Sequence, residues 1–181
     1  MIVKATEGKG YVVASYASYM AAVRASSAKA AAYTLAWPEN GWEADYANFK
    51  ATSGLRVGEA GGLDFEPFPS KQPNADPKTF ATYICGFADQ FKADRGVDPL
   101  FYTPDVFVPQ IKQYATSAQW ARILQLPFWK PGKGGLYVTD PAVGYGDTFG
   151  FKLAMWQWSD KPLDQNLLYV PWDTIAVRSA S

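Results

Sequence analysis

The chain has 181 residues, 48% of them hydrophobic, and its 17 basic and 17 acidic side chains give a formal net charge of zero. Without a basic excess, neither nucleic acid nor an anionic membrane is an expected partner. Histidine is absent, which excludes Ser-His-Asp and Cys-His catalysis, and the lone Cys85 excludes an intrachain disulfide. The longest uncharged stretch, residues 10–23, is shorter than the roughly 18 residues that span a bilayer. The length predicts one domain over residues 1–181.

Strands and helices are predicted to alternate along most of the chain. Periodic apolar positions predict helices at residues 15–27, 41–52, 77–95 and 110–114. Short β-prone runs predict strands at residues 2–5, 30–36, 61–67, 100–103, 124–129, 136–139, 153–158 and 167–170. This alternation indicates parallel strands with crossover helices, and the strand-rich last third departs from it. We therefore expect an α/β fold, a modified (β/α) TIM-like barrel with an irregular last third.

The clearest predicted element is the helix between Asp76 and Gly96. Asp76 can cap this helix, Pro77 suits its first position and Gly96 can end it. One face of the helix is apolar and carries Phe80, Ile84, Phe87 and Phe91. We expect this face to lie against the core.

Two carboxylates stand on the strand predicted at residues 61–67. Asp64 and Glu66 are two positions apart, so both point to one face of a strand while Phe65 packs on the other. Two like charges this close, where the strand end is partly shielded from water, raise the pKa of one of the two carboxyl groups. That group stays protonated and can donate a proton, while its partner is ionised. Acid cleavage of a glycosidic bond needs such a pair. The alternative is an exposed edge strand with two solvated acids, since perturbed pairs also occur for structural reasons.

Further candidate site residues lie near the carboxyl ends of the predicted strands, where parallel α/β folds gather their chemistry. The polar candidates are Glu7, Thr103, Gln157, Asp164 and Asn166. The aromatic candidates are Tyr33, Trp37, Tyr102, Trp129, Trp156 and Trp158. Tyr and Trp offer rigid apolar rings that can meet the flat C–H faces of sugars. The alternative is packing in the core, which we expect for about half of these rings.

Five short motifs follow one another between residues 2 and 166. They read IVKATEG from residue 2, LDFE from residue 63, PLFYT from residue 99, MWQW from residue 155 and LDQN from residue 163. This succession resembles glycoside hydrolase family 25, the lysozymes or muramidases that are common among bacteriophage endolysins. Each motif is weak by itself, so their order and spacing carry the resemblance.

The resemblance implies a modified (β/α) barrel that cleaves the β-1,4 bond between N-acetylmuramic acid and N-acetylglucosamine in peptidoglycan. By position, Glu66 matches the general acid, and Asp64 matches a partner carboxylate that orients or stabilises the substrate's acetamido group as internal nucleophile. Asp164 matches a further acid that lines the site. The groups that match the lining of the glycan cleft are Tyr33, Tyr102, Trp156 and Gln157. The family needs no metal and no cofactor, so none is expected here.

The sequence departs from the family pattern at two places. The family opens with a strand that bears an Asp-Val-Ser-like motif, whereas this sequence starts at what would be the second strand, so that strand and its Asp are missing. The family's Tyr-His pair after the third strand reads Tyr33-Thr34 here. A barrel that lacks a strand exposes an edge, which a neighbouring element, a partner chain or an upstream segment must cover.

Three functions are consistent with these residues. The first is an active muramidase that acts on the bacterial cell wall, as a phage lysin does. The second is a catalytically weak or inactive glycan-binding module, and the third is a structural component, for instance of a virion, that completes its open edge with another subunit. The motif-bearing acids favour the first. Residues 1–30 imitate a signal peptide only in part, because Glu7 interrupts the basic start, and no localisation is predicted.

Overall fold

The computed structural model describes residues 1–133, 136–161 and 164–179. The strands are β1 (Ile2–Glu7), β2 (Tyr11–Val12), β3 (Ala31–Leu35), β4 (Ala60–Asp64), β5 (Leu100–Tyr102), β6 (Pro127–Pro131), β7 (Lys152–Ser159) and β8 (Gln165–Leu168). The α-helices are α1 (Tyr16–Ala25), α2 (Trp42–Ser53), α3 (Phe80–Arg95), α4 (Val108–Tyr114) and α5 (Ser117–Ile123). Short 3₁₀ turns are η1 (Pro38–Asn40), η2 (Pro77–Thr79), η3 (Asp105–Phe107), η4 (Pro141–Val143) and η5 (Trp172–Thr174).

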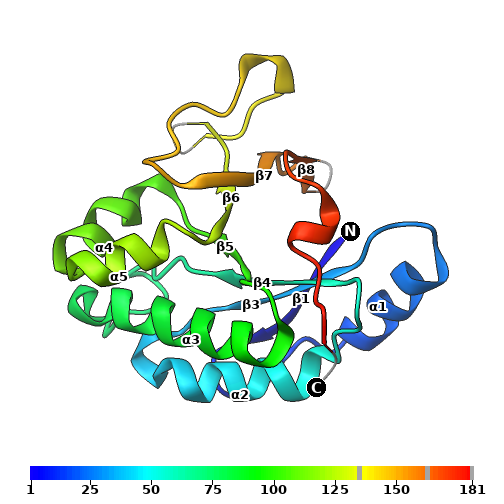
Figure 1. Ribbon diagram of the computed structural model, residues 1–181, viewed down its shortest axis with the longest axis horizontal. Coiled ribbons are helices and arrows are strands. Elements are labelled where there is room, and N and C mark those ends of the chain that lie inside the picture. The colour runs from blue at the N-terminus through cyan, green and yellow to red at the C-terminus, as the bar shows by residue number, and fades with distance from the viewer. Residues whose placement is uncertain (134–135, 162–163, 180–181) are drawn as a thin grey trace.

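The strands form a single curled sheet in the order β2-β1-β3-β4-β5-β6-β7-β8 (Figure 1). Neighbours from β1 to β7 in this order are parallel, whereas β2 is antiparallel to β1 and β8 is antiparallel to β7. The predicted α/β fold is thereby confirmed. The sheet is a half-barrel with two free ends, β2 and β8, within the described residues, and so differs from the closed ring of a TIM barrel.

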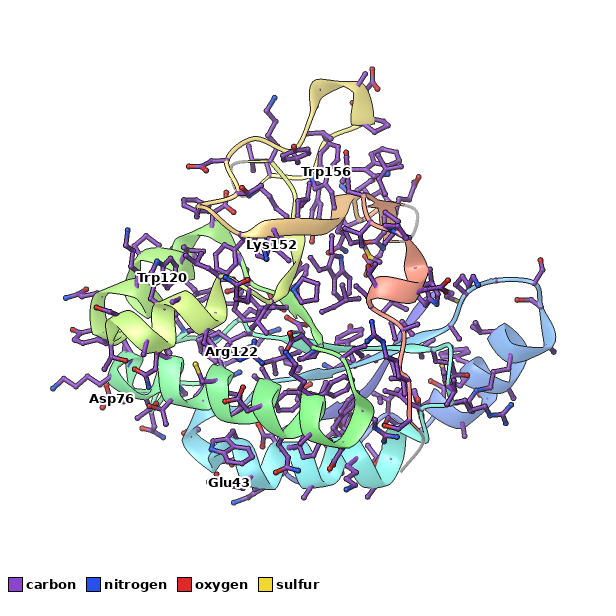
Figure 2. The ribbon with its side chains drawn as sticks, viewed as in Figure 1. Glu43, Asp76, Trp120, Arg122, Lys152 and Trp156 are labelled. Carbon is purple, nitrogen blue, oxygen red and sulfur yellow. The ribbon has the colours of Figure 1, made fainter. Side chains whose placement is uncertain are left out.

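Helices cover one face of this sheet, and the other face curls inward. Helices α2 and α3 lie side by side along the covered face, and α4 and α5 continue this layer beside β5 and β6 (Figure 1). Side chains fill the space between the helices and the sheet (Figure 2). This core is rich in phenylalanine, including Phe49, Phe65 and Phe101. In the part of the chain that the structure describes, no helix has the length and apolar character needed to cross a membrane.

Helix α3 agrees with its prediction at both ends and on its buried face. The Asp76 carboxylate accepts a hydrogen bond from the backbone N–H of Lys78, at 3.0 Å, and turn η2 leads into the helix. Gly96 ends it in the left-handed conformation, with φ of +76°. The four predicted apolar side chains are all buried, namely Phe80, Ile84, Phe87 and Phe91.

The structure differs from the predicted elements mainly after residue 114. Helix α5 was not predicted, although Thr116 and Gln119 form the reciprocal capping box that starts it. Because this helix continues to Ile123, the strand predicted from residue 124 begins only at Pro127, as β6. The strand predicted at residues 136–139 is reduced to one bridge between Lys133 and Leu136, next to residues outside the described ones.

Two further segments run along the open side of the sheet. Strand β2, which was not predicted, pairs with β1 only at Thr6 and Glu7, so within the described residues it covers only the far end of that edge. The C-terminal segment crosses from β8 back towards the start of β4, where Ala176 pairs with Ala60 (Figure 1).

Candidate active site

Asp64 and Glu66 lie at the end of β4, with their carboxyl groups away from the helices. The strand ends at Asp64, earlier than predicted, but the chain stays extended because the Phe65 N–H donates to the Tyr102 carbonyl at 2.8 Å. The Phe65 ring is fully buried under the helices, 5.0 Å from the ring of Phe80. The predicted alternation is therefore present, with Phe65 on the helix side and the two acids on the inner side.

Burial raises the pKa of both carboxyl groups, and repulsion by Glu66 adds to the rise at Asp64. Asp64 is 8% exposed, and its Oδ1 has no hydrogen-bond partner in the described part of the chain. Burial, and then the charge of Glu66, raise the pKa of Asp64 well above its usual value. Burial also raises the pKa of Glu66, and the nearby cations of Lys71 and Lys4 counter that rise in part. The pair can therefore retain a proton at a pH where an exposed carboxyl group has lost it.

Tyr33 connects this pair to two other predicted site residues. Burial raises the pKa of its hydroxyl, and further increases come from the charges of Asp64, Asp164, Glu66 and Glu7. All four acids therefore lie within electrostatic reach of a single phenol group. Strand ends that are far apart in the sequence thus converge on the inner side of β3, as the fold predicts.

Asp164 stands apart from the pair, just before β8. Its side chain is more exposed than those of Asp64 and Glu66. Partial burial raises the pKa of Asp164, and a hydrogen bond from the Gln157 side chain opposes this rise. Gln157 itself is buried on β7, where it faces Asn166 across the antiparallel pair.

Aromatic rings build the inner wall beside these acids. Trp129 on β6 lies edge-to-face against Tyr102, at 4.8 Å between ring centroids, and against Tyr33, at 5.8 Å. The Trp129 indole N–H donates to the Asn166 side chain at 2.7 Å, and the hydroxyl groups of Tyr102 and Tyr137 share a hydrogen bond of 3.2 Å. The orientations of the Trp129 and Tyr102 rings are thus fixed by polar contacts as well as by packing.

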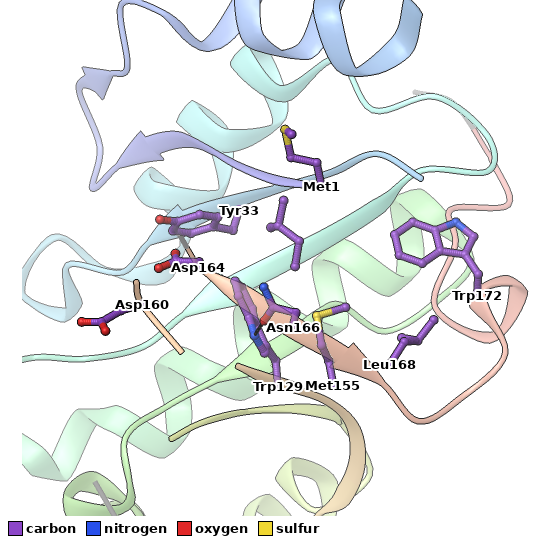
Figure 3. Close-up of a pocket in the computed structure, with 10 residues that line it drawn as sticks. Met1, Tyr33, Trp129, Met155, Asp160, Asp164, Asn166, Leu168 and Trp172 are labelled. Atoms are coloured by element: carbon purple, nitrogen blue, oxygen red, sulfur yellow. Dashed lines mark hydrogen bonds between the residues drawn. The ribbon is translucent and has the colours of Figure 1, made fainter. Parts of the chain in front are cut away.

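A cavity of about 620 Å³ opens between β1 and β8, along this wall (Figure 3). At one end of the cavity, Tyr33 and Asp164 lie together, with Asp160 beyond them. The other end is apolar, with Met1 and Leu168 among its lining residues. The volume lies within the range of about 300–1,000 Å³ that is usual for ligand sites.

Glu7, at the end of β1, is held by two donors that come from different places in the sequence. The Lys4 ammonium donates to Glu7 Oε2 at 2.6 Å, and the Trp37 indole N–H donates to Oε1 at 3.1 Å. Residues three apart point to opposite faces of a regular strand. The register of β1 against β3 shifts between Lys4 and Thr6, and this irregularity places Lys4 and Glu7 on one face. The sequence alone contains no signal for it.

Trp156 differs most from its predicted place in the site. The Trp156 side chain, labelled in Figure 2, is 0% exposed. Its indole N–H donates to the Gly132 carbonyl at 2.8 Å. This position leaves the ring no surface for a ligand, and it supports the chain turn at Gly132 instead. Trp156 is therefore packed in the core, which is the alternative given above for the aromatic candidates.

Within the described residues, no group of three or more Asp, Glu, Cys or His side chains is arranged to hold a metal ion. The acids of the site are spread over β1, β4 and the segment before β8. The arrangement therefore offers proton transfer and charge stabilisation by carboxyl groups beside an aromatic wall.

Comparison with known proteins finds a family model and solved structures that resemble this chain. A family model described as glycosyl hydrolases family 25 matches residues 1–166. Among curated protein sequences there is no significant match.

Solved structures share the fold at low sequence identity. The bacterial lysozyme of Streptomyces coelicolor is 21% identical with a TM-score of 0.75, over 96% of this chain and 84% of that one. A family 25 lysozyme of Aspergillus fumigatus is 18% identical with a TM-score of 0.75, over 97% and 86%. The catalytic domain of an endolysin from a bacteriophage of Listeria monocytogenes is 16% identical with a TM-score of 0.61, over 93% and 81%.

Proposed function

Because the chain belongs to glycosyl hydrolase family 25 and is therefore a glycoside hydrolase, we propose that it is a muramidase of the bacterial cell wall. The bond cleaved is the β-1,4 bond between N-acetylmuramic acid and N-acetylglucosamine in peptidoglycan. The observation that carries the proposal is the Asp64–Glu66 pair, in which two carboxyl groups with raised pKa values share one side of a strand end. Acid-catalysed glycoside cleavage requires such a pair.

Glu66 is the proposed general acid. Two carboxyl groups this close hold a proton as a pair, and Glu66 is the less buried of the two, so it can reach a bound sugar. Its proton passes to the glycosidic oxygen while the bond from C1 of the muramic acid unit to that oxygen breaks. The electron pair of that bond leaves with the oxygen, which becomes the O4 hydroxyl of N-acetylglucosamine.

Asp64 is proposed to orient the acetamido group of the muramic acid unit. Its unpaired Oδ1 can accept the acetamido N–H, and this hydrogen bond favours the charged form of Asp64 and leaves the shared proton on Glu66. The acetamido oxygen then forms a bond to C1 as the leaving group departs. Water next attacks C1 and gives its proton to Glu66, and the bond from C1 to the acetamido oxygen breaks.

The remaining inner residues are proposed to bind the glycan. Asp164 adds negative charge near the developing positive charge at C1. Tyr33 is the half-buried ring on which a sugar can lie, and Trp129 and Tyr102, only 4% and 7% exposed, hold it from behind. Gln157 is proposed to keep Asp164 in place through its side-chain amide. Trp156 is assigned no contact with the glycan, since it is fully buried.

Glycan binding without turnover is the second candidate. The observation that favours it is the open half-barrel, in which the cavity between β1 and β8 stands where a further strand would complete the sheet. A partner chain or an upstream segment is proposed to cover that edge. The same open edge is what a structural component would use to join another subunit.

The test is the chemistry of the product from purified peptidoglycan. Digested glycan is reduced with borohydride, and the reduced sugar at each new chain end is identified by mass spectrometry. A muramidase gives reduced N-acetylmuramic acid. Reduced N-acetylglucosamine as the sole new end would contradict the proposed bond, and saturable binding without new ends would favour the second candidate.

A further inference from the structure

We infer that a second cavity, at the ends of β1 and β3, binds another N-acetylated sugar unit of the same glycan by stacking on Trp37. This inference rests on the proposed function and extends it. The cavity has a volume of about 360 Å³ and is lined by residues 7–11 together with Trp37 and Asn40. We call it the Trp37 shelf.

The shelf combines an aromatic ring with open space above a glycine turn. Trp37 is half-buried, and Tyr11 at the rim is 58% exposed. A Cβ atom at Gly8 would lie 3.1 Å from the Trp37 ring and 2.8 Å from the Asn40 amide nitrogen, so only glycine lets this turn lie against them. At Gly10 a Cβ would meet nothing within 4 Å, so the space beside this glycine is open. A flat apolar ring with polar groups around it matches the face of a pyranose.

Buried hydrogen bonds hold the shelf in place without any ligand. Asp45 is fully buried and accepts from the Trp37 backbone N–H at 2.7 Å, the Asn40 amide at 3.1 Å and the Tyr83 hydroxyl at 2.6 Å. The Asn48 amide donates to the carbonyls of Gly8 and Tyr11, at 2.8 and 3.2 Å. A platform that is ordered in advance loses little entropy when a sugar binds.

The shelf is joined to the acid pair through Glu7. This residue lines the shelf and accepts the Trp37 indole N–H, while its charge also raises the pKa of Asp64. The larger cavity, with Tyr33 and Asp164, lies towards β6 and β8. Each cavity thus has a lining residue within electrostatic reach of the acid pair, Glu7 in the shelf and Tyr33 in the larger cavity, as expected if one glycan strand occupies both.

The experiment measures binding of N-acetylglucosamine oligomers of increasing length to the Glu66→Gln protein, which does not consume them. In this background, Trp37→Ala should weaken binding of the longer oligomers about threefold to tenfold and leave the shortest unchanged. Tyr11→Ala should have a smaller effect of the same kind. Tyr19→Ala is the matched control, because Tyr19 is equally exposed, at 57%, but lies on α1.

Three results would overturn the inference: no binding of any oligomer, equal affinity with and without Trp37, or an equal loss for short and long oligomers. If Trp37→Ala does not fold, the comparison of Tyr11→Ala with Tyr19→Ala decides alone. Release of new reducing ends by the wild-type protein is measured beside it. Turnover together with an unchanged Trp37→Ala affinity would reject the shelf and retain the muramidase, whereas a length-dependent loss without turnover would retain the shelf and reject the muramidase.

Discussion

At the end of β4, burial has different consequences for the side chains on the two faces of the sheet. On the helix side, Phe65 lies among aromatic rings, 5.0 Å from Phe80 and 5.8 Å from Tyr83. On the inner side, its neighbours Asp64 and Glu66 are desolvated carboxyl groups with raised pKa values. Burial stabilises the fold on the first face and opposes ionisation on the second. Within three consecutive residues, Phe65 therefore contributes to the stability of the fold, while Asp64 and Glu66 supply groups for proton transfer.

The largest expected effect on stability is at the helix-side face. Phe65→Ala removes a fully buried ring and should lower the free energy of unfolding by about 3–5 kcal/mol, measured by urea denaturation. Phe68→Ala is the control, because Phe68 is 36% exposed and packs on Phe107 from the surface. Equal losses in the two variants would contradict the assignment of Phe65 to the core.

A substitution at the preceding residue, Asp64, is expected to change the free energy of unfolding in the opposite direction. Asp64→Asn removes a buried carboxyl group with an unpaired oxygen, so it should raise the free energy of unfolding at neutral pH by about 1–3 kcal/mol. Glycan turnover should fall at least about a hundredfold, because the carboxylate proposed to orient the acetamido group is lost. A variant that is both less stable and fully active would contradict the account of this face.

The same pair predicts a pH dependence with a definite sign. The folded pKa of Asp64 lies above its unfolded value, so between those values the folded state binds more protons and its stability falls as pH rises. The stability advantage of Asp64→Asn should therefore be absent below about pH 3.9 and grow above it. Thermal unfolding of both proteins across this range measures it, and an advantage that shrinks with rising pH would contradict the raised pKa.

A smaller effect on stability is expected at Tyr83, whose hydroxyl donates to buried Asp45. Tyr83→Phe removes one of the three donors to buried Asp45 and should cost about 1 kcal/mol in the free energy of unfolding. Since the Trp37 backbone and Asn40 remain bonded to Asp45, turnover should change less than twofold. The measurement is a urea titration beside a turnover assay, and a large loss of turnover at unchanged stability would place Tyr83 in the site.

The helix side of the molecule could be predicted from the sequence better than the inner side. Helix α3 is specified by local features, namely its cap, its ending glycine and a periodic apolar face, and all of these appear in the structure. Asp64, Phe65 and Glu66 follow a simple alternation, which also appears. Such patterns depend on a few neighbouring residues, so sequence reasoning can recover them.

The parts that were not predicted depend on contacts between distant residues. Lys4 meets Glu7 only because the register of β1 shifts against β3, and β2 exists only because the chain turns back at Gly8. Trp156 has the same β-strand context as Trp129, yet one ring is enclosed by the turn at Gly132 and the other borders a cavity. In each case the outcome is decided by what packs against the residue.

The most direct test of the central claim compares two glutamates that differ in position alone. Glu66→Gln removes the proposed proton donor, and Glu43→Gln makes the same change on the exposed surface of α2 (Figure 2). Release of reducing ends from purified peptidoglycan should fall about a hundredfold or more in Glu66→Gln and stay at the wild-type rate in Glu43→Gln, with both variants folded. Wild-type release by Glu66→Gln would contradict the assignment of Glu66 as the acid.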